Sequence, residues 1–187
     1  MTFELHIKNM VCDRCIEAVR EELSKADIIF DSVALGKALV HAPTKDQLDV
    51  LQKGLRQRGF DLLQDSEEKT ISLIKTHIIT SIKQPDLLQN HNYSTYLEEQ
   101  IGKDYTTLSR LFSKKTQTTI EKFIIRQRIE RVKELLSYGE LSISEISNLL
   151  NYSSVQALST QFKKTEGLTP SQYLKQTNPD RTALDEL

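Results

Sequence analysis

The chain has 187 residues, of which 38% are hydrophobic and 27% are charged, and its formal net charge is −1 at pH 7. This composition is typical of a globular protein with one ordinary domain or two small ones. It excludes a membrane-spanning protein, because no stretch approaches the roughly 20 apolar residues that a transmembrane helix requires. The N-terminal segment lacks the apolar run of a secretion signal, so we expect a cytoplasmic protein.

The hydrophobic pattern of residues 1–64 predicts a small α+β domain. Alternating apolar and polar residues indicate strands, apolar residues at helical spacing indicate helices, and Gly36-Lys37 marks a hairpin. The predicted strands cover residues 2–8, 28–35, 38–42 and 60–63, and the predicted helices cover residues 13–25 and a segment with Leu48, Leu51 and Leu55 that Gly59 stops. The order βαββαβ is that of a ferredoxin-like sandwich.

The two cysteines of the chain, Cys12 and Cys15, lie between the first predicted strand and the first predicted helix. In a reducing compartment this spacing favours a metal or redox role over a structural disulfide. A loop lets both sulfurs face one ion, and the N-terminus of a helix stabilises the thiolate form. Two soft ligands without a nearby histidine suit a soft, low-coordinate ion such as Cu(I) better than four-coordinate zinc. Met10 is expected to pack beneath the loop.

Residues 2–64 resemble the heavy-metal-associated domains of copper chaperones and metal-transporting ATPases. The motifs that carry the resemblance are Met10-x-Cys12-x-x-Cys15 after the first strand, Gly36-Lys37-Ala38 in the hairpin and Gly59-Phe60 before the last strand. The resemblance implies that the two cysteines bind the metal and that the side chain of Phe60 shields it. Asn9 departs from the family, which usually has glycine there. A redox-active disulfide between the cysteines and a metallochaperone-like interaction module remain alternatives.

Beyond residue 64 the sequence predicts only helices. Residues 64–69 are polar and predict a linker, and a connecting helix follows that Pro85 ends, so residues 65–92 join the two domains. A second domain covers residues 93–178, with residues 179–187 as a tail. Reciprocal capping patterns predict helix starts at Thr95-x-x-Glu98, Thr118-x-x-Glu121 and Ser142-x-x-Glu145, and Ile125, Ile129, Val132 and Leu136 predict one long helix.

An internal repeat with an offset of 50 residues is the most informative feature of residues 93–178. The matched positions are Leu108-Ser109 with Leu158-Ser159, Phe112 with Phe162, Lys114 with Lys164, Thr119 with Thr169 and Phe123 with Tyr173. Two copies are too few for a solenoid, so we predict two modules joined by the long helix. Residues 93–178 carry 12 basic and 9 acidic side chains, against 9 and 11 in residues 1–66, which favours the C-terminal part for binding a polyanion.

Each module contains one predicted helix with the features of a DNA recognition helix. The predicted buried faces are Leu108, Leu111 and Phe112 in residues 104–116, and Val155, Leu158 and Phe162 in residues 153–165. The side chains left to face DNA are Tyr105, Thr106, Ser109 and Arg110 in the first helix and Ser154, Gln156, Ser159 and Thr160 in the second. Lys114-Lys115 and Lys163-Lys164 follow at equivalent points, where their ammonium groups are expected to meet phosphates.

These residues resemble the DNA-binding region of the AraC/XylS family over most of the second domain. The matching motifs are Leu108-Ser109-Arg110-Leu111-Phe112, Arg128-Ile129, Leu135-Leu136, Ile143-x-x-Ile146, Asn151-Tyr152-Ser153, Phe162-Lys163-Lys164 and Gly167-x-Thr169-Pro170-Ser171. The resemblance implies seven helices and two recognition helices in successive major grooves, roughly 34 Å apart. Gln117 departs from it where the first module normally has glycine, and the second recognition helix has no arginine or lysine for guanine. Arg110 is therefore the expected strongest base contact.

The sequence thus predicts a DNA-binding transcriptional regulator in which a soft metal ion, most simply Cu(I), on Cys12 and Cys15 changes the DNA affinity of the helical half. Double-stranded DNA is the expected partner, and RNA polymerase and a second copy of the chain are further candidates. No membrane partner is expected. No enzymatic activity is expected either, because the sequence has no phosphate-binding glycine-rich loop and no Ser/His/Asp arrangement.

Overall fold

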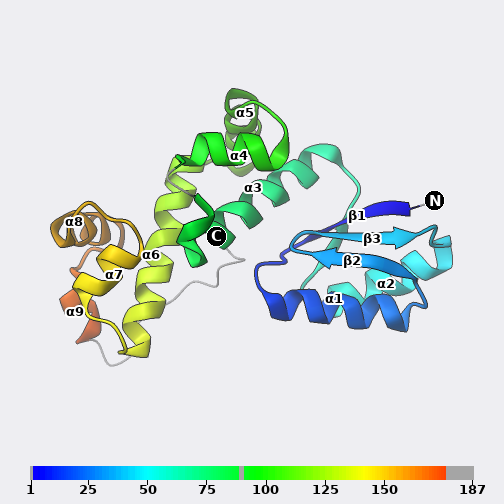
Figure 1. Ribbon diagram of the computed structural model, residues 1–187, viewed down its shortest axis with the longest axis horizontal. Coiled ribbons are helices and arrows are strands. Elements are labelled where there is room, and N and C mark those ends of the chain that lie inside the picture. The colour runs from blue at the N-terminus through cyan, green and yellow to red at the C-terminus, as the bar shows by residue number, and fades with distance from the viewer. Residues whose placement is uncertain (1, 89–90, 176–187) are drawn as a thin grey trace.

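The computed structural model describes residues 2–88 and 91–175 (Figure 1). The predicted tail at residues 179–187 therefore lies outside the described residues. A part that contains a β-sheet lies at one end of the molecule and an all-helical part at the other, with helix α3 (Ser66–Lys83) between them. Within the described residues, no helix is long and apolar enough to cross a membrane.

The N-terminal part has the element order βαββαβ, as the sequence predicted. Its elements are β1 (Thr2–Lys8), α1 (Asp13–Lys25), β2 (Phe30–Ala34), β3 (Lys37–His41), α2 (Lys45–Gln57) and β4 (Asp61–Leu63). The sheet is antiparallel with the strand order β2-β3-β1-β4, and α1 packs beside α2 below it in Figure 1. The core between the sheet and these helices includes the buried side chains of Ile7, Val19, Leu23, Val40, Leu51 and Leu55.

Strand β1 positions the cysteine loop and also meets the helical part. It pairs with β3 on one side and with β4 on the other, and it runs directly into the loop that contains both cysteines. Because side chains alternate along a strand, the buried Ile7 points to the core while His6 and Lys8 point to the opposite face. Helix α3 contacts β1 and β4. The sheet therefore lies between two helical layers at this end.

The linker predicted at residues 64–69 is shorter than expected, because α3 already begins at Ser66. The carboxylate of Asp65 caps this helix by accepting a hydrogen bond from the backbone N–H of Glu68, at 2.9 Å. Such a cap, with acidic residues in the first turn, favours helix over an extended linker. The buried isoleucines of α3 belong to the core of the helical part: Ile74, Ile78, Ile79 and Ile82. Helix α3 is thus an integral part of that core and not only a connection.

The C-terminal part contains two similar helix pairs on a long central helix. After a 3-10 helix (Pro85–Leu88) come α4 (Tyr93–Ile101), α5 (Tyr105–Thr116), α6 (Ile120–Tyr138), α7 (Ile143–Leu149), α8 (Val155–Glu166) and α9 (Pro170–Leu174). From α3 to α9 the described residues form seven α-helices, the number that the resemblance implied, but α3 precedes the predicted domain at residues 93–178. The predicted repeat is visible in the packing, since the ring centroids of Phe112 and Phe123 and those of Phe162 and Tyr173 are both 5.5 Å apart.

Two predictions from local sequence were wrong at the residue level. Ser142 forms the predicted capping box, but α4 and α6 are capped by Asn92 and Thr119 and not by Thr95 and Thr118. Val155, which was predicted to be buried, is 40% exposed at the start of α8. The capping patterns were offset because several neighbouring polar residues can cap a helix, and only the backbone conformation selects one of them.

Candidate nucleic-acid interface and cysteine loop

Helix α5 presents the first set of predicted DNA contacts. Asp104 caps the helix through the backbone N–H of Thr107, and Leu108 and Phe112 are fully buried beneath it. Thr106 and Arg110 are exposed on the outer side, whereas Ser109 is half-buried. The outer face therefore offers a hydroxyl and a guanidinium group, which suit hydrogen bonds to base edges in the major groove.

Tyr105 is less available for contact with DNA than the sequence suggested. Its hydroxyl donates a hydrogen bond to the carboxylate of Glu121 on α6, at 2.6 Å. Burial, the hydrogen bond and the charge of Glu121 together raise the pKa of Tyr105 well above its ordinary value. Tyr105 therefore joins α5 to α6, and its ring is only half-buried.

Helix α8 presents the second set of predicted DNA contacts. Gln156 and Thr160 are exposed one turn apart, and the amide of Gln156 lies 3.4 Å from the Thr160 hydroxyl. Ser159 is half-buried, and the hydroxyl of Ser154 is the N-cap that accepts from the backbone N–H of Ala157. The exposed side chain of Val155 was missed by the sequence reasoning, although the 50-residue offset pairs it with Tyr105, which was assigned to the outer face. An apolar side chain here suits contact with a thymine methyl group.

The four predicted phosphate-binding lysines lie in the last turns of α5 and α8. Lys114, Lys163 and Lys164 are exposed. Lys115 instead forms an ion pair with Glu67 in the first turn of α3, with 2.7 Å between Nζ and Oε2. The pair lowers the pKa of Glu67 and raises that of Lys115. The two modules therefore differ in how freely their lysines reach a phosphate.

Replacing Glu67 by glutamine should strengthen DNA binding at low salt several-fold. Lys115 then loses its internal partner and can neutralise one more phosphate, so the slope of log K against log salt should steepen by about one. The slope is measured by fluorescence anisotropy at a series of salt concentrations. Glu17→Gln is the matched control, because Glu17 forms an exposed ion pair with Arg20 on α1. An unchanged slope for Glu67→Gln would show that Lys115 does not reach DNA.

The turn after α5 keeps the left-handed backbone that glycine favours, despite Gln117. This residue has a φ of 57°, and its side-chain amide donates to the carbonyl oxygen of Lys114 at 3.1 Å. The corresponding turn after α8 has Gly167 with a φ of 82°. The departure from the family pattern is therefore accommodated by local strain and not by a different turn.

Replacing Gln117 by glycine should raise the free energy of unfolding by about 0.5–1 kcal/mol, because glycine adopts the left-handed conformation without steric cost. Thermal unfolding followed by circular dichroism checks this. In the reciprocal variant Gly167→Ala, an added Cβ would meet nothing within 4 Å. That variant should therefore lose about 1 kcal/mol from backbone strain alone. A loss of stability in Gln117→Gly would mean that the hydrogen bond to Lys114 outweighs the strain.

The two cysteines lie together at the start of α1. Both are free thiols of intermediate exposure, and their Sγ atoms are 3.4 Å apart. Burial opposes ionisation of Cys12, but hydrogen bonds from Cys15 and from the backbone N–H of Arg14, together with the charge of Lys83, lower the pKa of Cys12. Burial raises the pKa of Cys15. Cys12 is thus the thiol that ionises first.

The residues around the cysteines hold the loop in place. Met10 is fully buried in the core beneath the loop, as predicted, and Phe60 is buried in the same core. Asn9 adopts a φ of 70°, and its side-chain amide donates to the carbonyl oxygen of Gly59 at 3.0 Å. Asparagine tolerates this conformation better than most residues, so Asn9 can stand where the resembled domains usually have glycine. Within the described part of the chain, no three His, Cys, Asp or Glu side chains cluster as metal ligands.

The cysteine loop is attached to α3. The ammonium of Lys83 donates to the carbonyl oxygen of Val11 at 3.3 Å, and the hydroxyl of Thr76 donates to that of Met10 at 3.5 Å. The side chain of Val11 packs against the core of the helical part. Because α3 also contacts α4, α5 and α6, the cysteine loop and helix α5 share one supporting helix.

Comparison with known proteins identifies a helix-turn-helix domain in the helical part of the chain. Residues 97–176 match the family described as "Helix-turn-helix domain". The Msm operon regulatory protein of Streptococcus mutans is 38% identical over 69 residues, which make up 37% of this chain and 25% of that protein. The Raffinose operon transcriptional regulatory protein RafR of Pediococcus pentosaceus is 33% identical over 89 residues, 45% of this chain and 32% of that protein. The Xylose operon regulatory protein of Escherichia coli K12 is 32% identical over 75 residues, 40% of this chain and 19% of that protein.

A solved structure shows a similar fold. The C-terminal domain of AraT, a response regulator from Geobacillus stearothermophilus, has a TM-score of 0.51 at 23% identity, covering 64% of this chain and 95% of that one. The chain spans less than a third of the length of the three curated relatives described above. These curated relatives are regulatory proteins and not enzymes.

Proposed function

We propose that this protein is a DNA-binding transcriptional regulator of the AraC/XylS type, because residues 97–176 match a helix-turn-helix domain. The observation that carries the proposal is the structural repeat: α5 and α8 each rest on a buried aromatic pair, expose short polar side chains and end in two lysines. A polar outer face reads bases, and lysines at the helix end bind phosphates. Two such helices on α6 suit two successive major grooves of one duplex.

We further propose that the N-terminal part is a ferredoxin-like, heavy-metal-associated domain that binds Cu(I) through Cys12 and Cys15. The donor set fits such an ion, because the two sulfurs face one another at 3.4 Å and thiolates are soft ligands. Two thiolates with one monovalent cation carry a net charge of −1. The ammonium of Lys83, which already holds the loop through Val11, lies on the side where it offsets that charge.

Helix α3 is the route by which the metal could affect DNA binding. A ligand shifts an equilibrium only by its difference in affinity for the two states. The carbonyl oxygens of Met10 and Val11 accept hydrogen bonds from α3, so a rearrangement of the loop on metal binding alters these contacts. Helix α3 then transmits the change to α5, against which it packs. The proposed regulator also contacts RNA polymerase and forms a dimer with a second copy of the chain.

Metal and DNA binding should be measured together in the wild type and in the double variant Cys12→Ser/Cys15→Ser. In competition with a chelator of known Cu(I) affinity, the wild type should bind one ion per chain and the variant none. The affinity for the upstream DNA of its own gene, at about 0.15 M salt, should change with Cu(I) only in the wild type. Failure to compete with the chelator overturns the metal site, an unchanged DNA affinity overturns the coupling, and no binding to upstream DNA overturns the regulator.

The distance between the sulfurs also favours a second candidate, a redox-controlled regulator. Thiols at 3.4 Å can form a disulfide with little movement, since bonded sulfurs are about 2.05 Å apart. Because the pKa of Cys12 is lowered from that of an ordinary thiol, Cys12 is the attacking thiolate in an exchange reaction. Titration with glutathione redox buffers separates the two candidates. A reversible disulfide at cytosolic potentials, together with failure to bind Cu(I), would select the redox function.

A further inference from the structure

Arg128 joins the middle of α6 to the turn that precedes α8. Its guanidinium donates a hydrogen bond to the carbonyl oxygen of Leu150 and lies 4.0 Å from the centroid of the Tyr152 ring. The last carbonyl groups of a helix have no partner within the helix, so the bond to Leu150, the C-cap of α7, fixes the end of that helix. The cation over the aromatic ring fixes the orientation of Tyr152.

Tyr152 extends this connection to α8. Its hydroxyl donates to the side-chain carbonyl oxygen of Gln161 at 2.8 Å. Burial raises the pKa of Tyr152 more than the charge of Arg128 lowers it, so the hydroxyl stays protonated and remains a donor. Gln161 is half-buried in the middle of α8, directly after the exposed Thr160. A chain of directional contacts therefore runs from α6 to the part of α8 that carries a predicted base contact.

The internal repeat indicates that a module can fold without this polar connection. At the offset of 50 residues, α5 corresponds to α8 over its full length, and α4 corresponds to α7. The positions of Arg128, Tyr152 and Gln161 in the second module are those of Ile78, Gly102 and Leu111 in the first. None of these three residues of the first module has a side chain that can form a hydrogen bond. The bonds of the second module are therefore additional to what the fold of one module requires.

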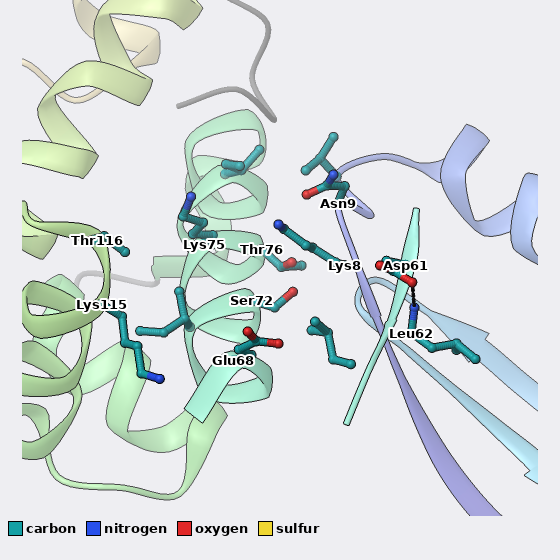
Figure 2. Close-up of a pocket in the computed structure, with 14 residues that line it drawn as sticks. Lys8, Asn9, Asp61, Leu62, Glu68, Ser72, Lys75, Thr76, Lys115 and Thr116 are labelled. Atoms are coloured by element: carbon teal, nitrogen blue, oxygen red, sulfur yellow. Dashed lines mark hydrogen bonds between the residues drawn. The ribbon is translucent and has the colours of Figure 1, made fainter. Parts of the chain in front are cut away.

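Helix α5 has a different support, which comes from the other end of the chain. It ends beside a cavity of about 400 Å³ between β1 and α3, where Figure 2 shows Lys115 and Thr116 on the side opposite Lys8. Lys115 pairs there with Glu67 of α3. Among the described residues, α8 packs on α6, α7 and α9. The contacts of Tyr152 thus hold α8 from within the second module itself.

The outer face of α8 makes its exact placement important for base recognition. The exposed side chains of its first half are short and uncharged, namely Val155, Gln156 and Thr160, and its basic residues lie only in the last turn. A hydrogen bond weakens steeply with distance and angle, so a short side chain reaches a base edge from a narrow range of helix positions. Such a contact requires placement within about 0.5 Å.

We infer that Arg128, Tyr152 and Gln161 are positioning residues, which hold α8 at the depth and rotation from which its short side chains read bases. The inference deepens the proposed DNA-binding function and rests on it. Arg128 fixes the ring of Tyr152, and the hydroxyl of Tyr152 in turn fixes α8 through Gln161. The base preference of the second module therefore depends on side chains behind its outer face.

Two conservative variants of the full chain test this role. Tyr152→Phe removes only the hydroxyl, and Gln161→Leu introduces the side chain of the first module. Binding to single-base variants of the target DNA gives the preference at each position, and Arg110→Ala marks the end that α5 reads. Either variant should reduce discrimination between bases about threefold to tenfold at the other end, the effect of one neutral hydrogen bond. The end read by α5 and the salt slope should be unchanged, because the lysines keep their phosphates.

Further variants show whether the effect belongs to this connection. The double variant Tyr152→Phe/Gln161→Leu should have no larger effect than either single one, because both remove the same bond. Arg128→Lys should act in the same direction, since an ammonium lacks the planar face that stacks on a ring. Tyr138→Phe is the matched control: the hydroxyl of Tyr138 donates to Glu134 at 2.8 Å at the end of α6. Its loss should leave both ends of the target unchanged.

Amide hydrogen exchange without DNA measures the hold on α8 directly. In Tyr152→Phe the amides of α8 should exchange about threefold to tenfold faster, whereas those of α5 should be unchanged. Unchanged exchange in α8 overturns the inference, and so does a loss of thermal stability with the base preference intact at both ends. A wild type that binds no upstream DNA overturns the proposed regulator, and the exchange measurement still decides whether these residues hold α8.

Discussion

Replacing Lys133 by alanine should lower the free energy of unfolding of the helical part by about 3–5 kcal/mol. Lys133 is 3% exposed on α6 and forms ion pairs with Glu130, one turn earlier, and with Glu166 at the end of α8. Truncation removes the cation and leaves the 6% exposed Glu130 without its partner in a medium that cannot solvate it. Urea unfolding followed by far-ultraviolet circular dichroism gives the free energy.

The control for this prediction is an ion pair of the same spacing at the surface. Arg20 and Glu17 also lie three residues apart on a helix, but 46% and 67% of their side-chain surfaces are exposed. Arg20→Ala should therefore cost less than about 0.5 kcal/mol. The double variant Lys133→Met/Glu130→Met should recover most of the loss, because a buried pair replaced by apolar side chains leaves no isolated charge. Equal effects of Lys133→Ala and Arg20→Ala would show that the buried cluster does not hold α8 on α6.

Replacing Arg110 by alanine should weaken binding to the target DNA by about 1–3 kcal/mol and relax the base preference at one position. Arg110 is exposed on the outer face of α5, whereas the basic side chains of α8, Lys163 and Lys164, lie only in its last turn. A guanidinium group can bond two acceptors of guanine at once, so its loss affects one base pair more than the others. Binding to a library of single-base variants of the target measures both the affinity and the preference.

Lys164→Ala is the matched control, because Lys164 is an exposed cation in the last turn of α8. Its loss should weaken binding equally for all sequences and reduce the salt slope by about one. The two variants thus separate base recognition from phosphate binding. If Arg110→Ala also weakens all sequences equally, Arg110 is a phosphate contact and the specificity of the first module lies in other side chains.

Several structural features could be predicted from the sequence because they depend on residues that are close together along the chain. Helix α1 covers the predicted residues 13–25. The strands and helices of the N-terminal part follow one another along the chain in the predicted order βαββαβ. Alternation and helical spacing are local patterns that follow from backbone geometry. The repeat also identified Phe112 and Phe162 as equivalent buried residues, and both are fully buried. The convergence of Cys12 and Cys15 follows from their spacing in a loop at a helix start.

Other outcomes required the folded chain. Arg128 was part of a family motif, but its role is set by tertiary contacts: it donates to the carbonyl oxygen of Leu150 and lies 4.0 Å from the ring of Tyr152. The exposure of Val155 depends on how α8 packs on α6, because the first turn of a helix can extend beyond the surface on which it rests. The apolar pattern within the helix does not distinguish such a residue from a buried one, and only the pairing with Tyr105 in the repeat pointed to its exposure.

The sequence by itself determined the elements, the repeated modules and the pair of thiols, since each of these depends on residues close together in the chain. Only the tertiary structure decided what joins the two halves. The ion pair between Glu67 and Lys115, the hold of Lys83 on the cysteine loop and the cavity between β1 and α3 bring together residues that are dozens of positions apart. Such contacts are set by the packing of whole elements against one another, and periodicity carries no information about them.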